Sequence, residues 1–103
     1  EYAREKGINV INTPAASSAS VAELVFAHLF GMVRFLFDSN RQMPMTGDAD
    51  FKSLKKSYAN GRELAGKTLG IIGFGRIGQE VAKRAIGLGM KVMAHDKFIE
   101  EVN

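Results

Sequence analysis

The sequence contains no cysteine among its 103 residues. This absence excludes disulfides, thiolate catalysis and cysteine-ligated zinc sites. Long runs of one charge are missing too: 14 basic residues stand against 11 acidic ones, the net charge is +3, and no basic run is longer than the pair Lys55-Lys56. Because nothing in this pattern indicates a nucleic-acid surface, we expect no nucleic-acid partner.

A continuous apolar segment of membrane-spanning length is also missing. The most apolar window, residues 21–37, contains Glu23, His28 and Arg34, so it is a poor membrane span and we expect no membrane partner. No signal peptide opens the chain, and the expected compartment is the cytoplasm. His28 falls on an apolar helical stripe, which favours a packed core or interface histidine. Since neither His28 nor His95 has a metal-ligand companion at useful spacing, we expect no metal site.

One stretch carries the pattern that organises the chain. Residues 69–72 form a short apolar, β-branched run typical of a buried parallel strand, and residues 73–78 read G-F-G-R-I-G, a G-x-G-x-x-G motif. An amphipathic helical pattern follows and ends at 87–89, and a second apolar run over 91–95 closes on Asp96. This order is the dinucleotide-binding fingerprint in its expected context. The predicted fold class is α/β: a Rossmann-like NAD(P)-binding fold with a parallel sheet and flanking helices, incomplete in this chain.

Each residue type in the motif has a physical reason. Gly73 permits the tight turn off the strand, Gly75 lets the backbone approach a pyrophosphate closely, and Gly78 lets the helix pack against the strand. The helix N-terminus offers unpaired N–H groups and a partial positive charge to the phosphates. Asp96 follows Gly78 at close to the separation of about 20 residues at which a carboxylate binds the adenosine ribose. Because an acid there repels a 2′-phosphate, the expected cofactor is NAD rather than NADP.

Upstream of the fingerprint the sequence predicts short elements and one long connection. Residues 1–6 are typical of the last turns of a helix that Gly7 caps, and residues 8–12 alternate as in a strand. Residues 38–62 are polar and contain proline and glycine, so we expect a long connection with one helical stretch over 50–58.

One long helix is predicted between these segments, over residues 20–37. Ser20 and Glu23 form a capping box at its start. Apolar residues recur along it on two neighbouring stripes, whereas a surface helix needs only one apolar face. We therefore expect both faces to be buried, one against its own domain and the other against a missing part of the chain or a partner subunit.

Longer stretches resemble one enzyme family. Residues 64–79, 87–92 and the pair His95-Asp96 are similar to the D-isomer-specific 2-hydroxyacid dehydrogenases. The chain begins without Met inside a helical pattern, so we interpret it as a piece of a longer protein. The resemblance divides the chain into three parts. Residues 1–14 would be the end of the substrate domain with a crossing strand, and residues 15–63 an interdomain or dimerisation helix with a long connection. Residues 64–103 would be the first βαβ unit of the dinucleotide-binding domain.

The upstream segments narrow the resemblance. Residues 7–14 and 20–24 resemble the crossing of this family from its substrate domain into its coenzyme domain. The runs 38–44 and 54–58 are most similar to D-3-phosphoglycerate dehydrogenases, whose pathway is serine biosynthesis.

The resemblance also implies an activity and further site residues. Members of the family have two Rossmann-like domains, are usually dimeric, and transfer a hydride between NAD(H) and a small 2-hydroxy or 2-keto acid. By this similarity the backbone at Arg76 and Ile77 would hold the pyrophosphate, Asp96 the adenine ribose, and Val21 would lie near the nicotinamide. The helix over 20–37 would form part of a homodimer interface. The family's catalytic Arg, Glu and His lie in motifs that this sequence does not contain, so we expect no catalytic residue here.

Two other functions stay open at this point. The same fold serves non-enzymatic corepressors as an NAD-sensing dimerisation module, and this sequence resembles them as well. The segment could also be a dimerisation unit that is indifferent to NAD.

Overall fold

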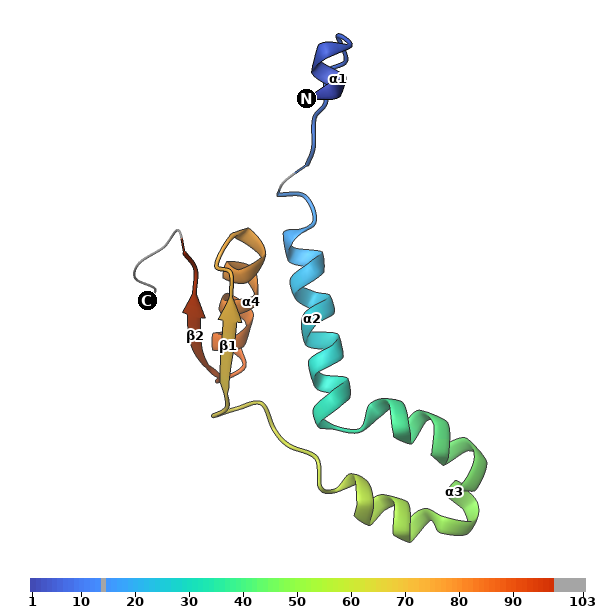
Figure 1. Cartoon of the computed structure of the whole chain (residues 1–103). Helices are drawn as coiled ribbons and strands as arrows, with labels where there is room; N and C mark the ends of the chain where they lie inside the picture. Colours follow the sequence, from blue (N-terminus) through green and yellow to red (C-terminus); the bar gives the residue numbers. More distant parts are fainter. Residues whose placement is uncertain (14, 98–103) are drawn as a thin grey trace.

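The computed structural model describes residues 1–13 and 15–97 of the chain. Within them the radius of gyration is 20.0 Å, well above the value of about 13 Å expected for a compact domain of 100 residues. Figure 1 shows why: a small β-α-β body packs beside one long helix, while the first helix and a bent helical arm project away from it. The elements in chain order are α1 (Tyr2–Glu5), α2 (Ser18–Val33), α3 (Leu36–Tyr58), β1 (Thr68–Ile72), α4 (Arg76–Gly87) and β2 (Lys91–His95).

Strand β1, helix α4 and strand β2 form the βαβ unit that the sequence predicts. Strands β1 and β2 pair in parallel, with Thr68 opposite Lys91 and Ile72 opposite His95, and α4 forms the crossover between them. Along each strand exposed and half-buried residues alternate, because only one face of the sheet is covered. On the open face Ile72 is 92% exposed and Met93 is 68% exposed. The predicted order of strand, helix and strand is confirmed.

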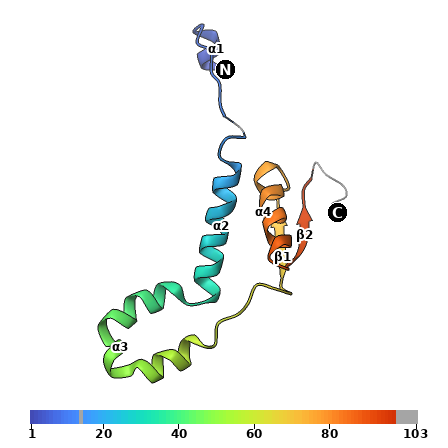
Figure 2. The same cartoon turned by 180° about the vertical axis from the view of Figure 1, so that it is seen from behind.

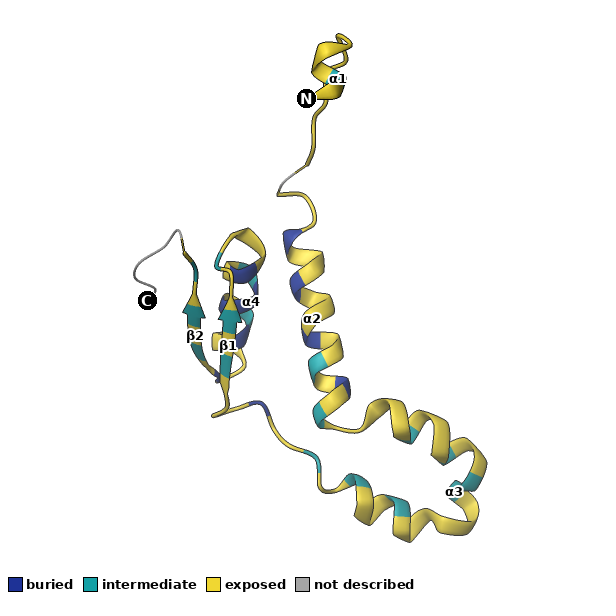
Figure 3. Ribbon diagram, in the orientation of Figure 1, coloured by how far each residue is buried: buried dark blue, intermediate teal, exposed yellow. Residues whose placement is uncertain are grey.

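The core lies where α2 packs against α4 and α4 against the sheet. Ala22 and Phe26 of α2 meet Val81 and Ala85 of α4, and Leu64, Met90 and half-buried strand residues complete the cluster. Figure 3 shows the buried positions of both helices against a mostly exposed chain. Burial on one face of α2 agrees with the expectation that one of its two apolar stripes packs against its own domain.

The second stripe of α2 is exposed. We name it the outer stripe; its members recur at helical spacing, and they are Val21, Leu24, Val25, His28 and Met32. His28 is therefore not a core residue of this chain, and the interpretation of His28 as a core histidine is wrong because the core uses the neighbouring face of the helix. The alternative, an interface histidine, stays a prediction.

The predicted bounds of this helix are also corrected. Helix α2 starts at Ser18 with Ser17 as its N-cap, and no side chain caps it, so the predicted capping box of Ser20 and Glu23 does not form. Ser18, the first residue of the helix, is buried and lies upstream of the predicted capping signal. The helix ends before the expected Phe37, because Phe35 adopts φ +58 and separates α2 from α3.

The predicted connection over 38–62 is mostly helical instead. Helix α3 runs through Pro44 and bends at Asp50 (φ −118, ψ 26), which gives the folded arm seen in Figures 1 and 2. The base of the arm is closed because Tyr58 Oη donates to Asp38 Oδ2 at 2.9 Å. Partial burial, together with this hydrogen bond, raises the pKa of Tyr58. The predicted stretch 50–58 is the second half of α3; the first half was missed because Pro44 and Gly47 are poor helix formers by intrinsic propensity.

At the N-terminus α1 ends as predicted, with Gly7 at φ +76 just after its C-cap. The predicted strand over 8–12 is wrong. Ile8, Val10 and Ile11 are 58%, 74% and 89% exposed, and the only strands in the described part of the chain are β1 and β2. An alternating run becomes a strand only when it has a partner to hydrogen-bond, and this run has none among the described residues.

The lengths and hydropathies of the helices can be compared with those of membrane-spanning helices. No single helix among the described residues is long and apolar enough to cross a membrane, although α2 and α3, bent by 54° at their junction, reach that length and hydropathy together.

Candidate functional site

The glycine-rich turn joins β1 to α4 at the carboxyl edge of the sheet. Its first residue, Gly73, has φ +91, a backbone conformation that disfavours any side chain. The N–H of Gly73 donates to the carbonyl oxygen of His95 at 2.7 Å, so the ladder between the strands continues into the turn. Gly73 thus allows the chain to leave the sheet sharply while still attached to β2.

The other two glycines of the motif serve different purposes. A Cβ at Gly78 would lie 2.5 Å from the carbonyl oxygen of Gly73, so only glycine lets α4 pack this closely on the turn. Gly75, by contrast, has an extended conformation (φ −78, ψ −156) that other residues adopt, and a Cβ there would meet no atom within 4 Å. Neither backbone strain nor packing within the described chain requires glycine at this position. The role that the motif predicts for Gly75, space for a pyrophosphate close to the backbone, is compatible with this open space.

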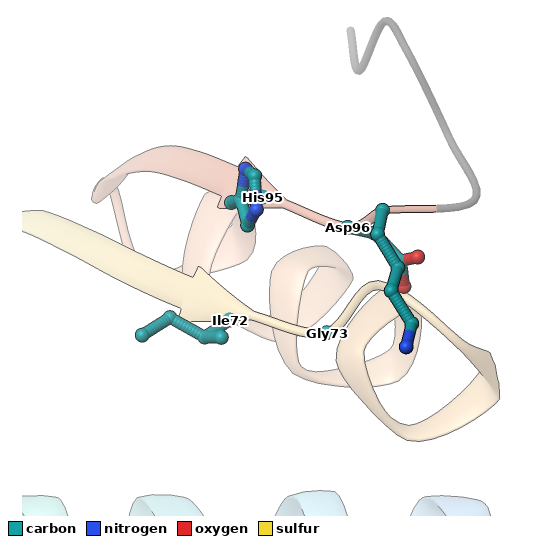
Figure 4. Close-up of a pocket in the computed structure, with 5 residues that line it drawn as sticks. Ile72, Gly73, His95 and Asp96 are labelled. Atoms are coloured by element: carbon teal, nitrogen blue, oxygen red, sulfur yellow. The ribbon is translucent and has the colours of Figure 1, made fainter.

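Two open hollows border this turn. The first, of about 390 Å³, lies between the strand ends and is shown in Figure 4; it is lined by Ile72, Gly73, His95, Asp96 and Lys97. The second, of about 570 Å³, lies at the start of α4 and is lined by Ile71, Ile72, Gly73, Gly75, Arg76, Ile77 and Gly78. Asp96 lines the first hollow and the start of α4 the second, and the two hollows have Ile72 and Gly73 in common.

Asp96 follows β2 directly and lies beside the turn (Figure 4). Its Oδ2 accepts a hydrogen bond from the backbone N–H of Phe74 at 2.6 Å. A carboxylate has two oxygens and about four acceptor sites, so this bond is compatible with acceptance from ribose hydroxyls as well. The sequence predicted an acid at this place, and the structure brings it to the glycine-rich turn.

The remaining predicted site residues lie at the same end of the molecule. Arg76 and Ile77 are the first two residues of α4, where backbone N–H groups have no partner within the helix, and no side chain caps this end. Val21 lies in the first turn of α2, which reaches the same end of the molecule as the turn before α4 (Figures 1 and 2). Contacts of these residues with a cofactor stay predictions.

One residue that the sequence reasoning missed is Gln79. Its Nε2 donates to the carbonyl oxygen of Phe74 at 3.2 Å. Its place four residues after Gly75, on the first turn of the helix, was the available signal. Further along α4, Arg84 Nη1 donates to Glu80 Oε2 at 2.6 Å, and this bond, together with the charge of Lys83, lowers the pKa of the Glu80 carboxyl.

The residues present fit a dinucleotide better than a metal. Among residues 1–13 and 15–97, no three His, Cys, Asp or Glu side chains gather to hold a metal ion. The space beside Gly75 and the free N–H groups at the start of α4 suit a pyrophosphate, and Asp96 suits a ribose.

Comparison with known proteins agrees with this chemistry. Residues 26–103 match the family model described as D-isomer specific 2-hydroxyacid dehydrogenase, NAD binding domain. The chain belongs to this family. The match confirms the predicted Rossmann-like fold, the family resemblance and NAD as the cofactor of the domain.

Individual relatives cover nearly the whole chain. It is 50% identical over 96 residues to the hydroxypyruvate reductase of Thermotoga maritima, and 46% identical over 99 residues to the D-3-phosphoglycerate dehydrogenase of Methanocaldococcus jannaschii. These matches cover 93% and 96% of the chain but only 29% and 18% of the relatives. The chain thus spans less than a third of the length of either enzyme.

Solved structures of similar proteins also match nearly the whole chain. The D-lactate dehydrogenase of Aquifex aeolicus, complexed with NAD and lactic acid, matches 97% of the chain with a TM-score of 0.68 and 36% identity, over 28% of its own length. The TT0316 protein of Thermus thermophilus matches 97% of the chain with a TM-score of 0.82 and 36% identity, over 31% of its own length.

The different purposes of the glycines make a prediction about stability. In the intact protein without cofactor, Gly78→Ala lowers the free energy of unfolding by about 2 kcal/mol, because its Cβ overlaps the backbone of Gly73. Gly75→Ala does not lower it and raises it by up to about 1 kcal/mol, since its Cβ enters open space and the unfolded chain loses conformational freedom. Urea denaturation followed by circular dichroism measures both. Equal losses in the two variants would contradict the distinction.

Proposed function

We propose that this chain is the cofactor-holding segment of an NAD-dependent dehydrogenase that interconverts a 2-keto acid and a 2-hydroxy acid. The observation that carries the proposal is the open space beside Gly75, which the chain needs neither for its conformation nor for its packing. Asp96 supports it, because its carboxylate lies at the same turn and suits a ribose hydroxyl. NADH, when bound, supplies the hydride that reduces the carbonyl carbon of the keto acid.

This proposal predicts which cofactor the intact protein prefers. NADH binds at least tenfold more tightly than NADPH, a difference of about 1.4 kcal/mol, because a 2′-phosphate is repelled by the Asp96 carboxylate. Asp96→Ala weakens NADH binding and narrows the preference, whereas the control Asp48→Ala, an exposed acid on α3, leaves both affinities unchanged. Calorimetric titration of the wild type and both variants with each cofactor measures all six affinities. Equal wild-type affinity for the two cofactors would end the proposed role of Asp96, and binding of neither would end the dehydrogenase proposal.

For the substrate we propose 3-phosphoglycerate, and with it a place in serine biosynthesis. The similarity to a D-3-phosphoglycerate dehydrogenase over 96% of the chain supports this choice. The 50% identity to a hydroxypyruvate reductase favours a second candidate, hydroxypyruvate.

A kinetic assay separates the two substrates. Oxidation of NADH by the intact protein is followed with 3-phosphohydroxypyruvate and with hydroxypyruvate, and we expect the phosphorylated acid to have at least a tenfold higher kcat/KM. The reverse order would make hydroxypyruvate the substrate. Turnover of neither acid would favour the alternative function, a non-enzymatic NAD-sensing dimerisation module of the corepressor type.

We also propose that the protein is a homodimer joined through α2. The outer stripe supports this proposal, since Leu24 is 58% exposed and Met32 is 66% exposed on one helix face. Contiguous exposed apolar surface of this kind marks an interaction site more often than a free surface.

Sedimentation velocity of the intact protein tests the dimer. Leu24→Lys introduces a charge into the outer stripe and weakens dimerisation at least tenfold, whereas Met45→Lys, at an 84% exposed position on α3, does not. A dimer that survives Leu24→Lys would show that α2 is not the interface. If the dimer forms only when NADH is present and no keto acid is turned over, the module of the corepressor type is the better description.

A further inference from the structure

Both backbone polar groups of Phe74 are held by side chains from outside the turn. The N–H of Phe74 donates to Asp96 Oδ2 at 2.6 Å, and the carbonyl oxygen of Phe74 accepts from Gln79 Nε2 at 3.2 Å. The first side chain comes from the end of β2 and the second from the first turn of α4. Phe74 itself is half-buried between the two conformationally distinct glycines of the turn.

We infer that Asp96 and Gln79 form a clamp on Phe74, and that both are positioning residues that shape the phosphate site before any cofactor arrives. This inference rests on the proposed function of the turn as a pyrophosphate site. The inference gives Gln79 a positioning role at the phosphate site, whereas the G-x-G-x-x-G motif specifies only the three glycines there. For Asp96 it adds a second role, because the acid expected to bind the ribose also orders the turn.

The geometry explains why such a clamp is needed. Gly73 and Gly75 flank Phe74, and glycine is the residue that gives a turn the greatest conformational freedom. The ladder bond from Gly73 to His95 fixes only the start of the turn. Without further restraint, the peptide units on either side of Phe74 would sample several orientations, and binding would carry the entropic cost of ordering them.

The two hydrogen bonds restrain successive peptide units. Asp96 holds the unit that joins Gly73 to Phe74, and Gln79 holds the unit that joins Phe74 to Gly75. In a trans peptide the N–H points opposite to the preceding carbonyl, and no peptide bond in the described chain is cis. Gln79 therefore sets the direction of the Gly75 N–H, a group on the rim of the larger hollow.

The clamp also links the two halves of the site. The carboxylate that we propose for the ribose also accepts from the turn that we propose for the pyrophosphate. A change at Asp96 should therefore affect the glycine-rich turn even when no ribose is present. A role limited to ribose recognition predicts no such effect, and this difference makes the inference testable.

The first test is amide exchange in the intact, cofactor-free protein, measured by NMR on ¹⁵N-labelled samples. Asp96→Ala removes the acceptor, and we expect the Phe74 amide to exchange about tenfold faster. Asp96→Asn keeps a side-chain oxygen as acceptor, and we expect exchange within about twofold of the wild type. Unchanged exchange in Asp96→Ala, or equally fast exchange in Asp96→Asn, would overturn the role of Asp96 in the clamp.

The second test addresses Gln79. Gln79→Met keeps the length of the side chain without its donor, and we expect NADH to bind about fivefold more weakly while the thermal unfolding midpoint stays unchanged. Gln42→Met, at an exposed glutamine on α3, is the matched control and should alter neither. Wild-type affinity in Gln79→Met, or a loss that only follows a fall in stability, would overturn the clamp.

These outcomes are distinct from a failure of the proposed function. If the wild-type protein binds no NADH, the dehydrogenase proposal is lost, yet the exchange rates still report whether Asp96 holds Phe74. If NADH binds, but Phe74 exchange in the Asp96 variants and NADH affinity in Gln79→Met match the wild type, the proposed function stands and the clamp does not exist.

Discussion

The parallel pairing of β1 with β2 is the constraint on which the rest of this structure depends. Adjacent parallel strands cannot be joined by a tight turn, so the chain needs a crossover, which α4 provides. The crossover covers one face of the sheet, and α2 then packs on α4 around Phe26 and Ala85. The same topology brings the start of α4 and the end of β2 to one edge, where Asp96 meets the glycine-rich turn.

The strands, turn and helix around the candidate site were largely predictable because they are local in sequence. Strand, turn, helix and strand occupy one continuous stretch, and each has a periodic signal strong enough to give β2 its observed bounds, Lys91–His95. The place of Asp96 followed from its spacing. Its hydrogen bond to Phe74 could not be foreseen, because the donor is a backbone N–H and any residue at that position would carry one. The hydrogen bond of Gln79 could not be foreseen for a similar reason, since its acceptor is the backbone carbonyl oxygen of Phe74.

The upstream half was less predictable because longer-range contacts decide it. The arm formed by α3 is closed by Tyr58 and Asp38, residues at its two ends, and no local window contains both. Residues 8–12 have the alternation of a strand, but alternation supplies no partner. Helix α2 starts at Ser18, two residues before the capping signal of Ser20, so this local signal did not set the observed start.

A cofactor site built this way separates two kinds of recognition. The turn, the start of α4 and Asp96 suit the phosphates and a ribose, which are the same whatever acid is reduced. Relatives named for different substrates, hydroxypyruvate and 3-phosphoglycerate, are 50% and 46% identical to this chain over 93% and 96% of its length. Such similarity is expected if the chain contacts the common cofactor and leaves the acid to other segments. Gly75 illustrates the point, because neither the conformation nor the packing of the described chain requires glycine there.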